Sequence, residues 1–314
     1  MELVPSRAPT IHFIGVSTKE SSIMKVFPCW AEELGLEGVT INGIDLPLHA
    51  PAGAYQEVVS FIRDDPNSNG ALVTTHKIDL FQAAHALFDE FDWFADSMHE
   101  VSSISKRNGK LVGQAKDPIS AGRALTGMLP GGFWPQSGGH VFCLGCGGAG
   151  VAITWFLLKG DHALGRPARM IVSDISAERL QHLHAIVDSP ALETQLIMGA
   201  GENDRILEYL PERSLVINAT GLGKDRLGSP ITDSGRFPPH GIVWELNYRG
   251  SLDFLRQAER AAARDDLELH DGWNYFIHGW TSVIADVFHA EIPTDPKSFA
   301  RLADVASEVS GRKC

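Results

Sequence analysis

The sequence predicts a two-domain α/β protein, because three features of the 314-residue chain agree. Segments typical of buried strands alternate with segments typical of helices, which favours parallel sheets covered by helices. A glycine-rich hexapeptide at Gly145–Gly150 lies between one such strand and one such helix. The length is sufficient for two domains, each with its own core.

The N-terminal part is interpreted as three strand–helix pairs followed by a hairpin. Pro28 is expected to disturb the first turn of the first helix, because proline lacks a backbone N–H. The Asn-Gly dipeptide at 108–109 is a strong signal for a tight hairpin turn. The expected strands are Ile11–Val16, Val39–Ile44, Ala71–Thr74, Ser103–Ser105 and Lys110–Val112, and the expected helices are Lys25–Leu34, Tyr55–Arg63 and Ile78–Leu87.

The rest of the chain continues the alternation. A helix over Pro118–Met128 is expected to lead into a glycine-rich loop that spans Pro130–Gly132 and Ser137–Gly139. One further strand–helix pair is expected after the helix Ala177–Val187. The remaining expected strands are His140–Leu144, Met170–Ser173, Leu215–Asn218 and Ile242–Glu245, and the remaining expected helices are Val151–Leu158, Leu252–Ala263, Asn274–His289 and Pro296–Val309.

The hexapeptide fits G-x-G-x-x-G in the setting that a dinucleotide site requires. The first glycine, Gly145, allows a tight turn, and Gly147 lets a pyrophosphate approach the backbone. Gly150 lets the helix sit close to the strand, with its N-terminal N–H groups facing the phosphates. Gly148 and Ala149 complete the loop as candidate cofactor contacts. The alternative is a glycine-rich turn that binds no cofactor.

Composition limits the class of protein. The formal net charge is −12, and no block rich in lysine and arginine is visible. Nucleic acid and anionic membranes are therefore not expected as partners. No stretch approaches 18 consecutive apolar residues, and the N-terminal segment does not resemble a signal peptide. We expect a cytoplasmic enzyme with a small-molecule substrate.

The cysteines and histidines do not predict a metal site. Cys143 and Cys146 form a C-x-x-C, which in other proteins marks a redox or zinc site. Here the pair falls on a strand end and a glycine turn, and no second C-x-x-C follows. We interpret both as small residues in a tight turn. The other two cysteines are Cys29 and Cys314, and the thirteen histidines are scattered.

Five segments, taken in chain order around the glycine loop, resemble motifs of the shikimate dehydrogenase family. The resemblance extends from about Ile11 to Val287 and implies a nicotinamide-dependent dehydrogenase. Gly70–Lys77 is similar to the family's G-x-N-V-T-x-P-x-K but one residue shorter, and Gly109–Asp117 is similar to its G-x-L-x-G-x-N-T-D. Ile217–Gly223 is similar to I-N-A-T-x-x-G. Glu245–Tyr248 is similar to D-x-x-Y, and Asp271–Gly272 is similar to D-G.

The resemblance implies how the two domains are divided. Residues 1–117 would form a smaller α/β substrate domain, completed by returning C-terminal helices at 270–314. Residues 118–269 would form a Rossmann-type, doubly wound parallel sheet that binds the dinucleotide. The substrate is expected in the cleft between them, and a homodimer is possible. Further cofactor contacts implied by the family motifs are Ala219, Thr220, Leu246 and Gly272.

The resemblance assigns proton transfer to Lys77 as the catalytic lysine and Asp117 as its paired aspartate. The chemistry is reasonable, because oxidation of an alcohol needs a group that accepts the hydroxyl proton. An ordinary lysine pKa of about 10.4 would have to fall towards neutrality through burial and the positive nicotinamide. The alternative for Lys77 is an exposed lysine at a helix start. Asp117 precedes a proline and is also a good helix N-cap.

Four substrate contacts depart from the family pattern. Ile23 replaces the second serine of an S-x-S, and Leu72 replaces the asparagine of N-V-T. Ser102 replaces a later asparagine, and Gly279 replaces a glutamine on the closing helix. Loss of such hydrogen-bonding partners weakens binding of the original substrate. The expected substrate-binding residues are Ser21, Ser22, Thr74, Ser102 and Tyr248.

The cofactor is expected to be NAD rather than NADP. NADP-dependent members of the family carry an N-R-T-like turn after the second strand of the nucleotide domain, where this chain has Asp174, Ile175 and Ser176. A carboxylate there accepts hydrogen bonds from ribose hydroxyls and repels a 2′-phosphate. The expected reaction is hydride transfer to or from a secondary alcohol of a small cyclic hydroxy acid or polyol. The alternatives are a genuine shikimate or quinate dehydrogenase and a catalytically silent NAD-binding regulator.

Overall fold

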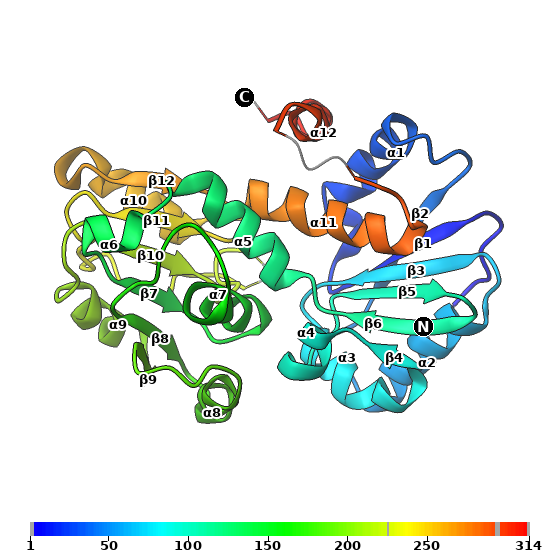
Figure 1. Ribbon diagram of the computed structural model, residues 1–314, viewed down its shortest axis with the longest axis horizontal. Coiled ribbons are helices and arrows are strands. Elements are labelled where there is room, and N and C mark those ends of the chain that lie inside the picture. The colour runs from blue at the N-terminus through cyan, green and yellow to red at the C-terminus, as the bar shows by residue number, and fades with distance from the viewer. Residues whose placement is uncertain (1–2, 225, 293–295, 313–314) are drawn as a thin grey trace. The chain divides into compact units, whose positions relative to one another are not determined.

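The computed structural model describes residues 3–224, 226–292 and 296–312. They form two compact units, one containing the chain up to Lys116 and the chain from Gly279 onward, the other Asp117–His278 (Figure 1). The division passes through α11 (Trp273–Phe288). No helix in these ranges is long and apolar enough to cross a membrane.

The first unit is built on a mixed six-stranded sheet in the order β2-β1-β3-β5-β6-β4. Strand β1 pairs in parallel with β2 and β3, and β5 runs antiparallel to β3 and β6. The strands are β1 (Thr10–Gly15), β2 (Thr40–Asp45), β3 (Ser68–Val73), β4 (Glu90–Phe91), β5 (Ser103–Arg107) and β6 (Lys110–Gln114). The helices are η1 (Thr18–Glu20), α1 (Ile23–Glu33), α2 (Ala52–Asp64), α3 (Lys77–Ala84), η2 (His85–Leu87), α4 (Trp93–Met98) and α12 (Pro296–Val309).

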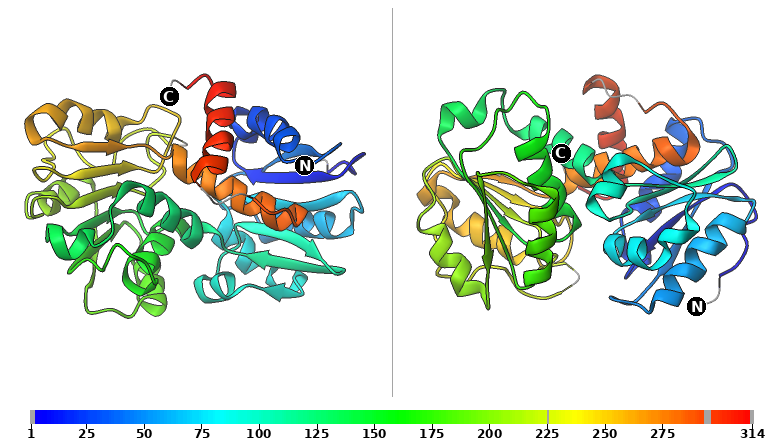
Figure 2. Two further views of the ribbon diagram at one scale, coloured as in Figure 1. Left: turned by 45° about the horizontal axis from the view of Figure 1, so that its top comes forward. Right: turned by 60° about the horizontal axis from the view of Figure 1, so that its bottom comes forward.

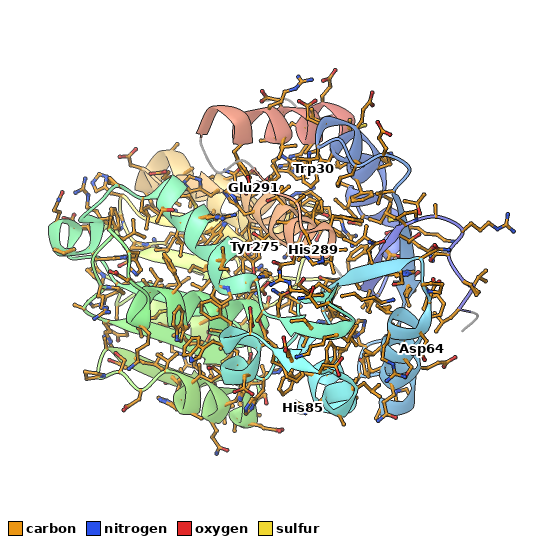
Figure 3. The ribbon with its side chains drawn as sticks, turned by 45° about the vertical axis from the view of Figure 1, so that its right-hand side comes forward. Trp30, Asp64, His85, Tyr275, His289 and Glu291 are labelled. Atoms are coloured by element: carbon orange, nitrogen blue, oxygen red, sulfur yellow. The ribbon has the colours of Figure 1, made fainter. Side chains whose placement is uncertain are left out.

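Helices cover both faces of this sheet (Figure 2). On one face, α2 and α3 bury apolar side chains such as Val58 and Leu80 against Ile14. On the other face, Trp280 of α11 packs edge-on against Phe13, with ring centroids 5.1 Å apart. Trp30 of α1 lies beside α12, where its indole N–H donates to a carbonyl oxygen at 2.8 Å (Figure 3).

The hairpin expected in this unit is confirmed, and the role of Pro28 is corrected. Arg107 pairs with Lys110, and both Asn108 and Gly109 have positive φ, as the tight turn requires. Helix α1 begins at Ile23, so Pro28 lies in its interior and not in its first turn. Proline cannot donate the backbone hydrogen bond of a helix interior. The fully buried apolar face of α1 stabilises the helix enough to offset the loss of this bond.

The second unit is a doubly wound sheet in the order β12-β11-β10-β7-β8-β9, with every pair parallel. This confirms the predicted Rossmann-type architecture. The strands are β7 (Val141–Leu144), β8 (Met170–Asp174), β9 (Leu192–Leu196), β10 (Leu215–Asn218), β11 (Ile242–Glu245) and β12 (Glu268–His270). The helices are α5 (Asp117–Met128), α6 (Phe133–Ser137), α7 (Gly148–Lys159), α8 (Ala177–Ile186), α9 (Ala200–Leu207) and α10 (Asp253–Asp265), followed by α11.

The central strands of the second unit are buried on both faces, which explains their continuous apolar runs. Helix α7 is apolar on nearly all sides, because it packs between the sheet and α5. Gly122 of α5 permits this approach, since a Cβ there would lie 2.4 Å from the Phe156 ring. The segment predicted as a loop before β7 contains the short helix α6. The glycines on either side of it are typical of loops and gave no sign of a helix.

Candidate active site

The glycine loop between β7 and α7 has the backbone geometry expected from its sequence. Gly145 has φ +104°, which residues with side chains rarely adopt. A Cβ on Gly150 would lie 2.2 Å from the Gly145 carbonyl oxygen, so only glycine fits there. A Cβ on Gly147 would meet nothing, and no side chain caps α7. The loop therefore leaves open space at the N-terminus of a three-turn helix, which suits a phosphate group.

Asp174 anchors the glycine loop. It ends β8 and is 7% exposed. Its carboxylate accepts hydrogen bonds from the backbone N–H groups of Cys146 at 2.7 Å and Ser176 at 2.9 Å. Each oxygen keeps a further lone pair, so these bonds are compatible with the predicted ribose contact. Ile175, the next residue, is 70% exposed.

The loop that follows β10 lies directly against the glycine loop. A Cβ on Gly145 would fall 2.8 Å from the carbonyl group of Ala219 and 2.9 Å from the backbone nitrogen of Thr220. Strands β7 and β10 are neighbours although β8 and β9 intervene in sequence, which defines the topological switch point. Doubly wound sheets bind ligands in the crevice at that point. The structure thus brings Ala219 and Thr220 together with Gly145, as the sequence motifs imply.

A buried polar network links β10 to β11. Glu245, which is fully buried, accepts hydrogen bonds from the side-chain amide of Asn218 at 2.7 Å and from that of Asn247 at 2.7 Å. The backbone N–H of Asn247 donates to the same carboxylate at 2.8 Å. Burial raises the pKa of Glu245 to about 7, against the opposing effect of these hydrogen bonds. The sequence motifs contain these residues, but their mutual contacts become visible only when the two strands pair.

The remaining predicted residues of the second unit lie around the start of α11. A Cβ on Gly272 would lie 1.9 Å from the Leu246 carbonyl oxygen, so the helix start packs on the backbone after β11. The half-buried Tyr248 ring lies 4.4 Å from the Phe276 ring and 5.4 Å from that of Trp273. The tyrosine predicted to bind substrate is therefore held among aromatic side chains.

In the first unit, Thr74 and Ser102 lie at one edge of the sheet. The Val73 N–H donates to the Ser102 carbonyl at 2.9 Å, and the Thr74 N–H donates to the Ile14 carbonyl at 3.0 Å. The Ser102 hydroxyl accepts a hydrogen bond from the backbone N–H of Lys116 at 2.7 Å. The chain therefore returns to this edge one residue before Asp117.

Lys77 begins α3 beside the same edge. Its carbonyl accepts a hydrogen bond from the Val101 N–H at 3.2 Å, and its side chain is half-buried. Asp117 is the first residue of α5, is 6% exposed and belongs to the second unit. Lys77 and Asp117 therefore each begin a helix, α3 in the first unit and α5 in the second.

A hydrogen-bonded chain lies next to Lys77, which sequence reasoning missed. His76 Nδ1 lies 3.0 Å from the Tyr55 hydroxyl, which donates to Asp79 at 3.4 Å. His49 Nδ1 lies 3.0 Å from the same Asp79 oxygen. Burial lowers the pKa of His76, while the carbonyl groups of Gly15 and Leu46 and the Asp79 carboxylate oppose this shift.

Ser21 and Ser22 lie between η1 and α1, Ile23 begins α1, and Leu72 lies within β3. Ser21 is 5% exposed and follows η1, whereas Ser22 is half-buried and precedes α1. Ile23 is fully buried, and Leu72 is 9% exposed within β3. Ile23 and Leu72 therefore belong to the apolar core of this unit. Lys116, which precedes Asp117, forms an ion pair with Asp286 of α11 at 2.6 Å.

The two cysteines near the glycine loop are buried thiols. Cys143 is fully buried, and Cys146 is 1% exposed. Burial, with a smaller effect of the Asp174 carboxylate, raises the pKa of Cys146 to about 12, and burial raises that of Cys143 further. Both therefore stay protonated and unreactive near neutral pH. Among the described residues, no group of three or more metal-binding side chains is present, and Cys314 lies outside them.

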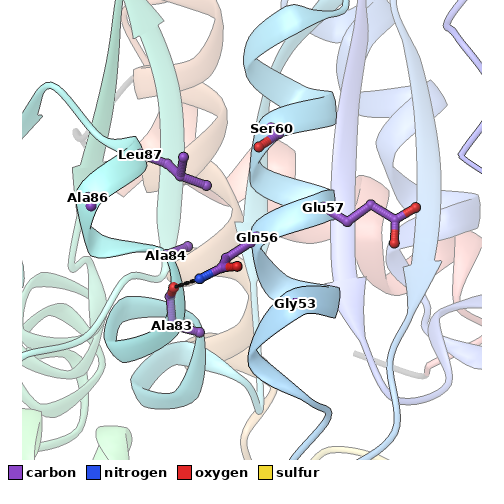
Figure 4. A pocket seen from close by; sticks show the side chains of 8 residues that line it. All are labelled: Gly53, Gln56, Glu57, Ser60, Ala83, Ala84, Ala86 and Leu87. Carbon is purple, nitrogen blue, oxygen red and sulfur yellow. Dashed lines mark hydrogen bonds between the residues drawn. The ribbon is translucent and has the colours of Figure 1, made fainter.

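Two surface hollows lie away from all predicted site residues. One, of about 480 Å³, lies between α2 and the segment formed by α3 and η2, where Gln56 donates to the Ala83 carbonyl at 2.8 Å (Figure 4). The other, of about 360 Å³, is bordered by Met198 and Arg205 near β9 and α9. Neither hollow is lined by a residue of the glycine loop or by Lys77.

Comparison with known proteins agrees with the observed fold. No family model matches the chain. A curated protein named shikimate dehydrogenase (NADP(+)) from Magnetococcus marinus is 29% identical over 204 residues, which span 65% of this chain and 65% of that relative. A shikimate 5-dehydrogenase from Thermus thermophilus, solved in complex with NADP(H) and shikimate, is 23% identical with a TM-score of 0.67, covering 95% of this chain and 99% of its own. A quinate dehydrogenase from Corynebacterium glutamicum, solved with NAD, is 18% identical with a TM-score of 0.67, covering 95% and 98%.

The fold and the glycine loop define a two-unit α/β protein whose second unit is of the Rossmann type. The chain is similar to shikimate dehydrogenases in sequence and in fold. The resemblance inferred from the sequence motifs is thereby confirmed.

Proposed function

We propose that this protein is an NAD(P)-dependent oxidoreductase of the shikimate dehydrogenase type. The glycine loop at the switch point carries the proposal, because its open backbone at Gly147 and uncapped α7 suit a pyrophosphate. The likeness to shikimate and quinate dehydrogenases supports it. A bound nicotinamide would supply the hydride acceptor or donor.

We propose further that NAD is preferred over NADP. The residues that would hold the adenosine ribose are Asp174 and Ile175, and neither offers a cation to a 2′-phosphate. A buried, ionised Asp174 would repel that phosphate. The curated relative is named for NADP(+), whereas the quinate dehydrogenase was solved with NAD. The proposed preference for NAD therefore depends on Asp174 and Ile175 and not on the cofactors of these relatives.

For the substrate, we propose a secondary alcohol on a small cyclic hydroxy acid or polyol. Lys77 would take the hydroxyl proton, and Asp117 would orient the lysine ammonium. Thr74, Ser102, Ser21 and Tyr248 remain the proposed substrate contacts. Ile23 and Leu72 remove polar partners that the family motifs supply, so the substrate would differ from shikimate.

The likeness to shikimate and quinate dehydrogenases favours one second candidate, a genuine shikimate or quinate dehydrogenase. A catalytically silent NAD-binding regulator is the outcome to exclude. The deciding experiment offers hydroxylated ring compounds, shikimate and quinate included, with NAD⁺ or NADP⁺ and follows cofactor reduction at 340 nm. Reduction that Lys77→Met abolishes would support the enzyme, whereas cofactor binding without turnover of any compound would favour the regulator.

A further inference from the structure

The loop of residues 219–222 is fixed at both ends by the buried network around Glu245. Strand pairing sets Asn218 opposite Glu245, and both side chains are fully buried. Asn218 donates to Glu245 and uses its own amide oxygen to accept from the Thr220 hydroxyl at 2.7 Å. Asn247 donates to Glu245 and also to the Leu222 carbonyl at 3.0 Å. One carboxylate therefore orients the two amides that hold the loop.

The network needs Glu245 in its ionised form. All three groups that contact the carboxylate are N–H donors, namely the Asn247 backbone and the side-chain amides of Asn218 and Asn247. Oε1 accepts two hydrogen bonds, from the backbone and the side chain of Asn247, so a proton on Oε1 would displace one of these donors. Oε2 accepts one, from Asn218, and a proton there would make it a weaker acceptor. Protonation would therefore weaken or break at least one of the contacts that orient the two asparagines.

The loop that these asparagines hold faces the dinucleotide crevice. Ala219 and Thr220 lie against Gly145 at the switch point between β7 and β10. Asp174, which would contact the adenosine half under the proposed function, ends β8, the neighbour of β7 on the side away from β10. The loop after β10 therefore borders the other half of a dinucleotide, which carries the nicotinamide.

We propose that Glu245 is a positioning residue for the nicotinamide half of the cofactor, because its ionised carboxylate holds residues 219–222 in the binding conformation and its protonation weakens binding. The inference depends on the proposed function. The raised pKa of about 7, caused mainly by burial, makes the coupling observable near neutral pH. Asp271, which lies before α11, is a further charged group that raises this pKa.

The test measures NADH binding by calorimetry from pH 6 to 8.5. For a group with a pKa near 7, the ionised fraction falls about tenfold between pH 8 and pH 6, so the dissociation constant of the wild-type protein should rise about tenfold. Glu245→Gln places an amide where the network needs an acceptor. It should weaken binding at pH 8 by about tenfold or more and remove the pH dependence. Glu259→Gln, on the exposed face of α10, is the matched control and should behave as wild type.

A second variant keeps the test decisive if Glu245→Gln does not fold. Asn247→Ala removes one side-chain donor and leaves Asn218 bonded to the carboxylate. It should weaken binding at pH 8 by about threefold and retain the pH dependence. Thermal melting of each variant separates a folding defect from a binding defect, since a merely structural role would lower the melting temperature without changing the pH profile.

Two results would overturn the inference. Wild-type binding that is independent of pH, or a folded Glu245→Gln that binds NADH as tightly as wild type at pH 8, would remove the role of Glu245 and leave the proposed function intact. A wild-type protein that binds neither NADH nor NADPH at any pH would contradict both the role of Glu245 and the proposed function.

Discussion

The Nδ1 nitrogen of His76 lies 3.0 Å from the hydroxyl oxygen of Tyr55, and this contact ties the residue before Lys77 to helix α2. Tyr55 is 1% exposed and His76 is equally buried. Because the Tyr55 hydroxyl donates to Asp79, it accepts from His76 in the tautomer that carries a proton on Nδ1. The start of α3 is therefore anchored by a side chain from the preceding helix.

We expect Tyr55→Phe to destabilise the first unit, because it leaves His76 Nδ1 buried without its partner. The free energy of unfolding should fall by about 1–3 kcal/mol, measured by urea denaturation at pH 7.5. Tyr209→Phe, on a side chain that is 80% exposed, is the control and should change little. Equal stability of Tyr55→Phe and wild type would show that the contact contributes nothing.

Replacement of the candidate catalytic lysine should separate chemistry from cofactor binding. Lys77→Met keeps the aliphatic stem and removes the amine, so kcat should fall by roughly 10²- to 10⁴-fold. The affinity for NAD should change little, since the glycine loop belongs to the other unit. Asp117→Asn should have a smaller effect. A near-normal kcat for Lys77→Met would exclude it as the base and make His76 the next candidate.

Cofactor preference should depend on the two residues at the end of β8. We expect NAD to bind at least about tenfold more tightly than NADP, equivalent to about 1.4 kcal/mol. Ile175→Arg supplies a cation at an exposed position and should raise NADP affinity, whereas Tyr209→Arg, equally exposed elsewhere in the unit, should not. Calorimetry measures both. Equal or tighter NADP binding by the wild-type protein would contradict the assignment.

Shikimate should be a poor substrate. The loss of one charged and two neutral hydrogen bonds at Ile23, Leu72 and Gly279 would cost about 2.5–6 kcal/mol, or roughly 10²- to 10⁴-fold in kcat/KM. Steady-state kinetics with shikimate and either cofactor checks this. A kcat/KM above about 10⁴ M⁻¹s⁻¹, within the usual range for natural substrates, would favour a genuine shikimate dehydrogenase.

Acid should destabilise the protein through His12. Its ring is fully buried in β1, and neither ring nitrogen has a hydrogen-bond partner within the described residues. Burial lowers its pKa to about 4, with Lys106 adding to the shift and Asp65 opposing it. The unfolded chain takes up a proton near pH 6.5, whereas the folded chain does not, so stability falls as pH drops from about 6.5 towards 4.

Denaturation of His12→Leu and wild type at several pH values tests this. The stability difference should shift in favour of His12→Leu as the pH falls, by up to about 3 kcal/mol near pH 4. His240→Leu, at an exposed histidine, should show a much smaller change. Parallel pH profiles for wild type and His12→Leu would contradict the expectation.

Local sequence was sufficient wherever one short segment determined its own conformation. The Asn108-Gly109 turn and the glycine loop needed positive φ at particular residues, and glycine or asparagine marks such positions. The continuous apolar runs of β7, β10 and β11 identified strands buried on both faces. These signals predicted the doubly wound unit and the location of the glycine loop.

Local sequence was insufficient where partners are distant along the chain. Pro28 was misplaced because burial of α1 against the sheet, and not helix propensity, determines where that helix begins. The contact between Tyr55 and His76 joins two helices, and that between Asn218 and Glu245 joins two strands 27 residues apart. No local pattern marks such pairs.

The sequence alone was therefore enough to propose a chemistry for this protein, because the glycine loop is recognisable from residue type and spacing and the family resemblance points to Lys77 and Asp117. The side chains that would hold this site in place became visible only in the folded chain. Hydrogen bonds such as those of Glu245 depend on strand pairing and on removal of water from both partners. Both conditions arise from the folded chain as a whole and from no single segment of it.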